Sequence, residues 1–345
     1  MSHVGLRWAA MRRFVFLVVL LAAACDRSPS EPPGRPSTVA REPVRRAPTV
    51  QDTSYRLPGS DRIVAFGDVH GDVGGVRAVL RLAGVIDDKD AWIGKKTIVV
   101  QTGDQLDRGD TEPEVLDLFD DLAKKAKAAG GRFYALNGNH EVMNVSGDFR
   151  YVTEDGFLDW KGVKPTSARS AQKVDTFAEL MRGRAAAFLP GGPVAVRLAQ
   201  HPVAIVVGET AFVHGGILPG HVEYGIARLN RETSEWMQGK RPRMPALLAS
   251  EASPIWNRSY SEGEPSERSC RALERALELL KAKRMVVGHT VQKQGITSAC
   301  GDKVWRIDVG LAKVYGGKPA ALEIRGAAVK ALTEKSSTAP PVAAE

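Results

Sequence analysis

Five short motifs in the chain combine glycine with acidic, amide or imidazole side chains. They are GDVHG (67–71), GDQLDRG (103–109), GNHE (138–141), HGG (214–216) and GHT (288–290). Each follows an apolar run that is typical of a buried strand. Taken singly, each motif is an ordinary turn, but together they contain four of the seven histidines of the chain. Because the strands of one sheet can end at the same edge, the set predicts a single catalytic crevice.

The side chains in these motifs suit two divalent metal ions. In an extended segment Asp68 and His70 point to the same side, so both can bind one ion. The two oxygens of Asp104 can bridge this ion to a second one. The second site would be completed by one amide oxygen and two imidazoles, from Asn139, His214 and His289. Carboxylate, amide and imidazole ligands suit Mn, Fe or Zn better than Ca or Mg, so we expect two divalent ions of that kind as cofactors.

Such a centre predicts the class of substrate. Two divalent ions carry more positive charge than two carboxylates and one bridging hydroxide neutralise. A cationic centre of this kind attracts an anion whose hydrolysis creates further negative charge. A phosphate ester meets both conditions.

The elements that must position these motifs alternate between strands and helices in the first half of the chain. RIVAFGD (62–68), KTIVVQTGD (96–104) and RFYALNGNH (132–140) each begin as a strand, with helix-like segments between them. A capping box formed by Thr111 and Glu114 predicts the start of the second helix, and Gly130 and Gly131 predict its end. This βαβαβ order predicts an α/β fold with its site at the carboxyl ends of the strands. In the second half, predicted strands outnumber helices.

The five motifs together resemble those of the calcineurin-like metallophosphoesterases, in the phosphoprotein-phosphatase branch. SPIWNR (253–258), RMVVGHTVQ (284–292) and KVWRIDVG (303–310) further resemble the bacterial-type Shewanella-like phosphatases. The resemblance covers residues 60–328. It implies a four-layer αββα sandwich, in which two mixed β-sheets are flanked by helices.

The resemblance also implies a role for each motif residue. One metal would be held by Asp68, His70 and Asp104, and the other by Asp104, Asn139, His214 and His289. His140, oriented by Asp107, would be the general acid. Arg108 and Arg258 would bind the phosphate. For Arg258 an alternative interpretation is a loop anchored by a buried Trp256.

We therefore expect a metal-dependent phosphomonoesterase that attacks its substrate with a metal-bridging hydroxide and acts on phosphoproteins. One alternative is a nucleotide or other small-molecule phosphatase or diphosphatase of the cell envelope. Another, from a different class, is a metal-binding lipoprotein without catalytic activity.

The expected phosphoesterase domain covers residues 59–330. The segments between its motifs are too long for plain connections, so we expect inserted cap segments at about 144–200 and 218–255. The second contains LNRETSEWMQG (229–239), which is helical in pattern. A disordered tail is expected at 331–345. Loops of this kind usually select the substrate.

The N-terminus predicts export from a bacterial cell. A basic stretch is followed by an apolar run at 14–24, which is too short to span a bilayer but typical of a signal peptide over 1–24. LAAAC resembles a lipobox, so Cys25 is the expected lipidation site, although simple secretion is an alternative. Residues 25–58 are rich in proline and are expected to form a disordered tether. The protein would then be a membrane-anchored lipoprotein that faces the periplasm.

Composition and charge limit the classes of binding partner that we expect. The chain has 43% hydrophobic and 26% charged residues, which excludes a wholly disordered protein. Its 48 Lys and Arg against 40 Asp and Glu give a net charge of +8 with scattered basic residues, so no nucleic acid is expected as a partner. We expect a monomer that meets phosphorylated proteins or small phosphate esters.

Two cysteines remain after Cys25. Cys270 falls on a helical apolar stripe, so one interpretation is a buried free thiol. In an oxidising periplasm the alternative is a disulfide between Cys270 and Cys300. Of the histidines outside the motifs, His201 and His221 are expected to be structural rather than ligands.

Overall fold

The computed structural model describes residues 54–334. The predicted signal peptide, Cys25, most of the predicted tether and the end of the predicted tail lie outside these residues. Within residues 54–334, no helix combines the length and the apolar character that crossing a membrane requires.

The first sheet contains the βαβαβ unit that the sequence predicts. Its strands, in spatial order, are β11 (Ala328–Thr333), β10 (Ala320–Arg325), β2 (Ile63–Phe66), β3 (Ile98–Gln101) and β4 (Arg132–Ala135). Strands β2, β3 and β4 are parallel, and the connections between them contain α1 (Val73–Leu82) and α2 (Glu112–Ala128). The hairpin of β10 and β11 adds to β2 in antiparallel orientation, so the sheet is mixed.

The second sheet is built from the later part of the chain and one short N-terminal strand. Its strands, in spatial order, are β1 (Arg56–Leu57), β5 (Ala204–Val207), β6 (Thr210–Val213), β7 (Arg284–Val287), β9 (Val304–Arg306) and β8 (Thr297–Ala299). Strands β6, β7 and β9 are parallel, whereas β5 and β8 run antiparallel to their neighbours β6 and β9. This sheet is therefore also mixed.

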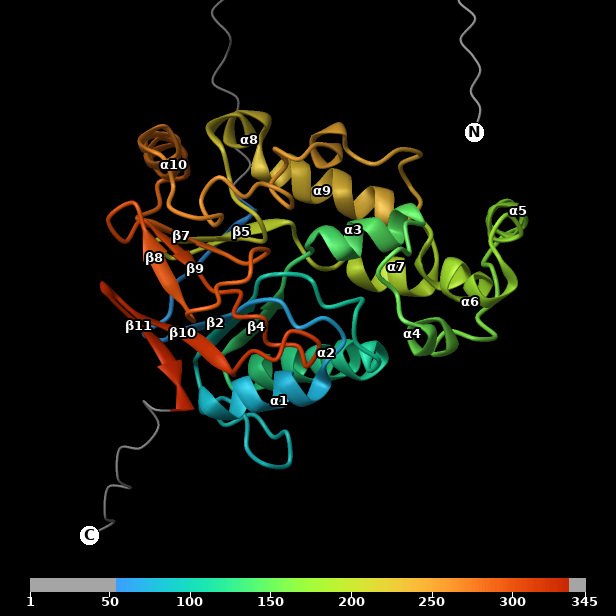
Figure 1. The fold of residues 1–345 in the computed structure, drawn as a ribbon, viewed down its shortest axis with the longest axis horizontal. Coiled ribbons are helices and arrows are strands. Elements are labelled where there is room, and N and C mark those ends of the chain that lie inside the picture. Colours follow the sequence, from blue (N-terminus) through green and yellow to red (C-terminus); the bar gives the residue numbers. More distant parts are fainter. Residues whose placement is uncertain (1–53, 335–345) are drawn as a thin grey trace, which may run out of the picture. The chain divides into compact units, whose positions relative to one another are not determined.

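The two sheets pack face to face and helices cover their outer faces. In β2, Ile63 and Ala65 point into a core shared with Phe212 and Val286 of the second sheet. The alternate residues of the same strand pack against α1 and α2. On the other outer face, α10 (Glu267–Leu280) and α8 (Pro219–Tyr224) cover the second sheet (Figure 1). The expected four-layer αββα sandwich is confirmed.

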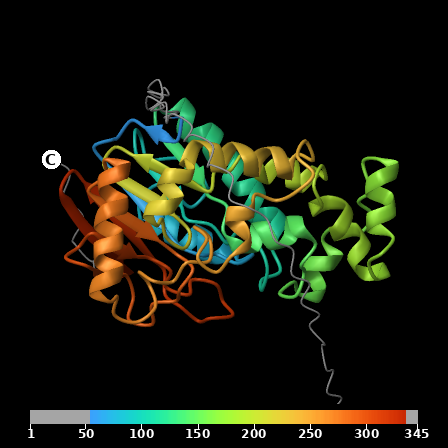
Figure 2. The same ribbon diagram turned by 90° about the horizontal axis from the view of Figure 1, so that it is seen from above.

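Parts of the two predicted insertions form a shared helical cap. Its elements are α4 (Glu154–Leu158), α5 (Ala168–Val174), α6 (Glu179–Phe188), α7 (Pro193–Leu198), α9 (Ile226–Met237) and the 3₁₀ turn Ala246–Ala249. Helix α3 (Asn139–Ser146), which carries the end of the GNHE motif, leads from β4 into the cap. Phe188 and Leu198 of the first insertion share one apolar core with Trp236 and Leu248 of the second. Figure 2 shows the helices of the first insertion extending sideways from the sheets.

Three local expectations differ from the structure. The tether does not reach residue 58, because Arg56 and Leu57 pair with β5 and Leu57 packs between the sheets. The tail does not begin at 331, because β11 continues to Thr333. The predicted capping box is also wrong. The Thr111 hydroxyl makes no bond within its own helix; it donates to the Gly71 carbonyl at 2.6 Å, so it joins the start of α2 to the loop before α1.

Cys270 of α10 and Cys300, just after β8, are joined by a disulfide in the structure, with 5.3 Å between their Cα atoms. Mass mapping of protein denatured without reductant should find this pair linked. Cys270→Ser should lower the free energy of unfolding by ~2–4 kcal/mol, because the link restricts the unfolded chain. Reductant should destabilise the native protein by a similar amount and leave the variant unchanged. Alkylation of both thiols in unreduced, denatured protein would contradict the link.

Candidate active site

The five motifs meet at one edge of the two sheets, as their positions after strands predict. Four of them contribute to the wall of a cavity of about 210 Å³. The predicted site residues on its wall are Asp68, His70, Asp104, Arg108, Asn139, His140, Arg258 and His289. His214 is fully buried against this wall, and Asp107 is fully buried behind His140. Residues far apart in the sequence, from both sheets and from α3, thus form one site.

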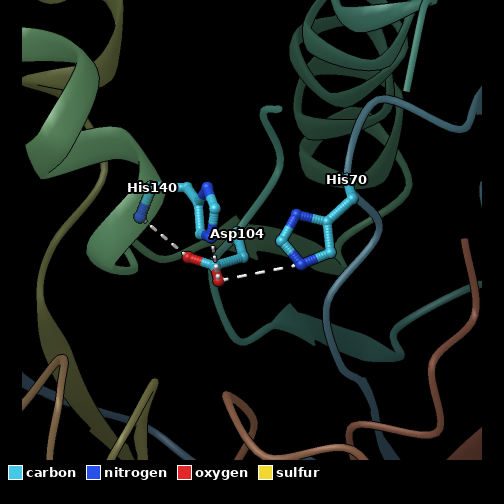
Figure 3. Close-up of side chains that lie close together, drawn as sticks. All are labelled: His70, Asp104 and His140. Atoms are coloured by element: carbon cyan, nitrogen blue, oxygen red, sulfur yellow. Dashed lines mark hydrogen bonds and ion pairs between the residues drawn. The ribbon is translucent and has the colours of Figure 1, made fainter. Parts of the chain in front are cut away.

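Asp104 lies at the centre of this cluster. Its Oδ2 atom is 3.2 Å from His214 Nε2, 3.7 Å from His140 Nε2 and 3.9 Å from His70 Nε2. Its Oδ1 atom accepts a hydrogen bond from the backbone N–H of His140 at 3.0 Å (Figure 3). Two groups of metal-ligand type share this carboxylate: one adds His70 and His140, and the other adds His214 and His289.

Backbone carbonyls orient two of the predicted ligand histidines, His70 and His214. The Nδ1 atoms of His70 and His214 lie 2.9 Å and 3.0 Å from the carbonyl oxygens of Leu106 and Thr102. A carbonyl oxygen only accepts, so each Nδ1 carries a proton and Nε2 is the nitrogen that turns toward the other site residues. Burial lowers the pKa of His70 to about 3, which keeps the imidazole neutral at neutral pH. Backbone carbonyls orient metal-bound histidines in this way.

Atoms that can bind a metal converge around His214. Its Nε2 atom lies 2.9 Å from the amide oxygen of Asn139, 3.1 Å from His289 Nδ1 and 3.2 Å from Asp104 Oδ2. His289 Nε2 is buried and has no hydrogen-bond partner among residues 54–334. Unpaired buried acceptors are costly, and a metal ion would satisfy them.

Asp68 lies on the same wall beside a carboxylate that the sequence analysis missed. Its Oδ1 atom accepts the backbone N–H of His289 at 3.1 Å and lies 3.8 Å from His214 Nδ1. Burial raises the pKa of Asp68, and the carboxylates of Asp308 and Asp104 raise it further. Asp308 lines the cavity, and burial raises its pKa to about 6. Its signal was present in KVWRIDVG (303–310), where it follows the last buried strand residues.

His140 and Asp107 form a buried pair. His140 Nδ1 and Asp107 Oδ2 are 2.5 Å apart, and His140 Nε2 faces Asp104 in the cavity. Burial lowers the pKa of His140, but the carboxylates of Asp104 and Asp107 outweigh it and raise the pKa above the ordinary value. The imidazole is therefore held ready to carry a proton.

The two predicted phosphate-binding arginines lie on the cavity wall among aromatic rings. The Arg108 guanidinium lies over the rings of Tyr151 and Tyr315, 4.8 and 5.6 Å from their centroids. Arg258 Nη1 donates to the carbonyl of His289 and to Thr290 Oγ1, both at 2.9 Å. Tyr151 and Tyr315 come from long loops without a motif, so sequence reasoning missed them.

Trp256, expected only as a buried anchor, also lines the cavity. Its ring meets the ring of His289 edge to face, with 5.6 Å between centroids. His201 and His221, by contrast, are absent from the cavity wall and from both groups of metal-ligand type. His221 Nδ1 accepts the backbone N–H of Leu218 at 3.0 Å, and burial lowers the pKa of each imidazole to about 4.

The loops that carry the site residues have unusual backbone dihedral angles. Five motif residues other than glycine have positive φ: His70, Asp104, Asp107, Arg108 and His289. The extended geometry expected for Asp68 and His70 is therefore wrong, because His70 has a φ of +41°. The backbone N–H groups of Val69 and His70 both donate to the Asp104 carbonyl, which bends the segment into a turn. Backbone strain of this kind concentrates at functional sites.

Glu141 joins two of these loops. Its carboxylate accepts the backbone N–H groups of Asp104, Gln105 and Gly138 at 2.9, 2.7 and 2.6 Å. The sequence analysis included Glu141 in the GNHE motif without assigning it a role.

Comparison with known proteins agrees with the fold and the motifs. Residues 61–293 match the model of the calcineurin-like phosphoesterase family. The chain is 41% identical over 308 residues to Shewanella-like protein phosphatase 2 of Arabidopsis thaliana, covering 80% of this chain and 78% of that protein. It is 28% identical over 275 residues to Shewanella-like protein phosphatase 1 of Plasmodium berghei, covering 76% and 71% of the two chains.

A solved structure shows the same fold. The cold-active protein-tyrosine phosphatase of a psychrophilic Shewanella species superposes with a TM-score of 0.63 at 24% identity, over 84% of this chain and 82% of that one. The residues that match the family model, 61–293, contain all five motifs. The chain belongs to the calcineurin-like phosphoesterase family, as a hydrolase of phosphoric esters related to the Shewanella-like protein phosphatases.

Proposed function

We propose that the protein is a phosphomonoesterase that uses two divalent metal ions and acts on phosphoproteins. The observation that carries the proposal is Asp104, one oxygen of whose buried carboxylate lies 3.9 Å from His70 Nε2 and 3.2 Å from His214 Nε2, which are assigned to different ions. The ligands would be Asp68, His70 and Asp104 for one ion, and Asp104, Asn139, His214 and His289 for the other. Two ions of Mn, Fe or Zn bound there would neutralise the phosphate charge and make water a better nucleophile.

The remaining side chains would bind the phosphate and donate a proton. Arg108 and Arg258 lie on the cavity wall, where their guanidinium groups can donate to phosphate oxygens. His140 holds a proton at Nε2, which faces the cavity, and donates it to the leaving oxygen. Asp107 keeps the ring in the required orientation and supports its positive charge.

The cavity favours a substrate that is mostly outside it. A volume of about 210 Å³ accommodates a phosphate and part of one side chain, so the rest of the substrate would lie against the surrounding loops and cap. A phosphorylated side chain on a protein meets this description. The name of the Arabidopsis relative, a protein phosphatase at 41% identity, supports the same substrate class.

We further propose that the mature protein is a lipoprotein of a bacterial envelope and faces the periplasm. The sequence pattern that supports this is the apolar run at 14–24, which is followed by Cys25.

Cys25→Ser should release the protein into soluble fractions or block its processing, because the acyl chain would be the anchor. Fractionation with the unchanged protein as control measures this. A processed variant that stays on the membrane would show another anchor.

Asp104→Asn should lower the metal content and slow turnover by more than about 100-fold, because a neutral amide is a poor ligand for two cations at once. Metal analysis of the purified domain together with hydrolysis of an aryl phosphate in Mn measures both effects. His201→Ala removes a histidine that belongs to neither group of metal-ligand type and should retain both ions. Two ions retained by the Asp104→Asn variant would contradict the assignment of the shared ligand.

His140→Asn should slow hydrolysis of a phosphoserine peptide much more than that of p-nitrophenyl phosphate. A serine alkoxide is a very strong base and needs a proton as it leaves. Phenols have a pKa of ~10 or below, so a phenolate can leave with less assistance from a proton donor. General acid catalysis contributes ~10²–10⁴-fold, so the difference should be large. Asp107→Asn should show the same pattern more mildly.

Equal losses on both substrates, with metal content unchanged, would mean that His140 does not donate the proton. The unchanged enzyme provides the reference for the substrate class. If it hydrolyses nucleotides or sugar phosphates faster than phosphopeptides, the phosphoprotein assignment fails while the metal assignment stands.

A further inference from the structure

Arg184 of α6 is a charged side chain that is completely buried, although it belongs to the inserted cap. Its guanidinium makes a bidentate pair with Glu112, at 2.6 and 3.0 Å. It also donates to the carbonyl of Gly156 and to Asn144 Oδ1, both at 2.8 Å. On one face it lies over the ring of Phe188, 4.5 Å from the centroid. Nothing in the assumed chemistry of the site uses this residue.

The remaining contact of Arg184 leads to the catalytic pair. Its Nη2 atom donates to Asp107 Oδ1 at 3.2 Å, while Asp107 Oδ2 holds His140 Nδ1. Asn144 Nδ2 donates to the same Oδ1 atom at 2.9 Å. Both oxygens of Asp107 are therefore engaged: one by residues of α6 and α3, and the other by His140. A carboxylate bound on both sides cannot rotate without breaking one of these bonds.

The charges explain why an arginine is needed. Asp107 and Glu112 are both fully buried, and the backbone N–H of Asp107 donates to Glu112 Oε1 at 2.6 Å. Two carboxylates so close repel each other unless a cation lies between them. The planar fork of a guanidinium reaches both at once, which the single ammonium group of lysine does not do.

We propose that Arg184 is a positioning residue for phosphate-ester hydrolysis, which fixes the Asp107 carboxylate so that His140 Nε2 points at the leaving oxygen. Helix α6 lies outside the sheets that carry the motifs, so the cap would complete the proton-donating pair as well as cover the site. The inference rests on the proposed role of His140 as proton donor. It adds that this role depends on a residue contributed by the cap.

The test compares two substrates in two variants of Arg184. Arg184→Lys keeps the charge but loses the fork. Arg184→Met combined with Glu112→Gln removes the cation together with one buried carboxylate. Removal of the cation alone would leave two buried carboxylates without a partner of opposite charge. For both, kcat and KM are measured with a phosphoserine peptide and with p-nitrophenyl phosphate, beside metal content and thermal unfolding.

We expect kcat for the phosphoserine peptide to fall about tenfold more than kcat for p-nitrophenyl phosphate in both variants. KM and the content of two metal ions should not change. The expected loss is smaller than that of His140→Asn, because the proton donor itself remains. Losses that are equal for the two substrates, or loss of metal, would overturn the proposal and leave Arg184 a purely structural residue.

Arg197→Met is the matched control. Arg197 also joins the cap to the body, through contacts of its guanidinium at 2.8 Å with Asp117 and with Asp120 of α2, but it touches neither His140 nor Asp107. It should lower the melting temperature without changing the ratio of the two kcat values. A changed ratio in this variant would also count against the proposal, since any loosening of the cap would then produce the effect.

The roles proposed for His140 and for Arg184 can be disproved separately. If His140→Asn itself shows no preference between the substrates, the proposed role of His140 is wrong and Arg184 has no donor to position. If His140→Asn shows the preference and the Arg184 variants do not, only the positioning role is wrong.

Discussion

The whole site depends on how the Glu141 carboxylate holds two loops together. By accepting three backbone N–H groups, it fixes the loop after β3 against the start of α3. Asp104 is thereby placed at the centre of three imidazoles, and its own carbonyl bends the first motif around it. Backbone N–H groups buried without partners would destabilise the fold, so the carboxylate serves both stability and site geometry.

The proposed proton-donating pair, His140 and Asp107, depends in contrast on two parts of the molecule. The loop after β3 supplies Asp107 and α3 supplies His140, whereas the residue that engages the outer oxygen of Asp107 comes from α6. The proposed metal ligands thus follow the strands of the two sheets, whereas the insertion supplies a residue that engages the carboxylate beside His140. This division agrees with the core that the two inserted segments share, which makes the cap a rigid part of the site rather than a loose loop.

What could be predicted from the sequence was local. Continuous apolar runs indicated the central strands, and glycine beside acidic or imidazole residues indicated the turns that meet at the site. Arg184, Asp308 and Tyr151 were not found, because their partners lie far away in the chain and no spacing rule connects them. The Thr111 capping box failed for the same reason: its hydroxyl found a partner in the loop before α1. Likewise, Leu57 is part of the fold because it pairs with β5, which lies far along the chain.

The crowding of Asp68, Asp104 and Asp308 in one buried wall has a thermodynamic consequence. Carboxylates that repel one another store unfavourable energy in the folded state, and cations that bind only this state relieve it. Binding and folding are then linked, so each increase in free metal above the dissociation constant adds to the free energy of unfolding. The lifetime of the protein would therefore follow the metal supply of its compartment, and scarcity of metal would remove the enzyme through unfolding as well as through lost turnover.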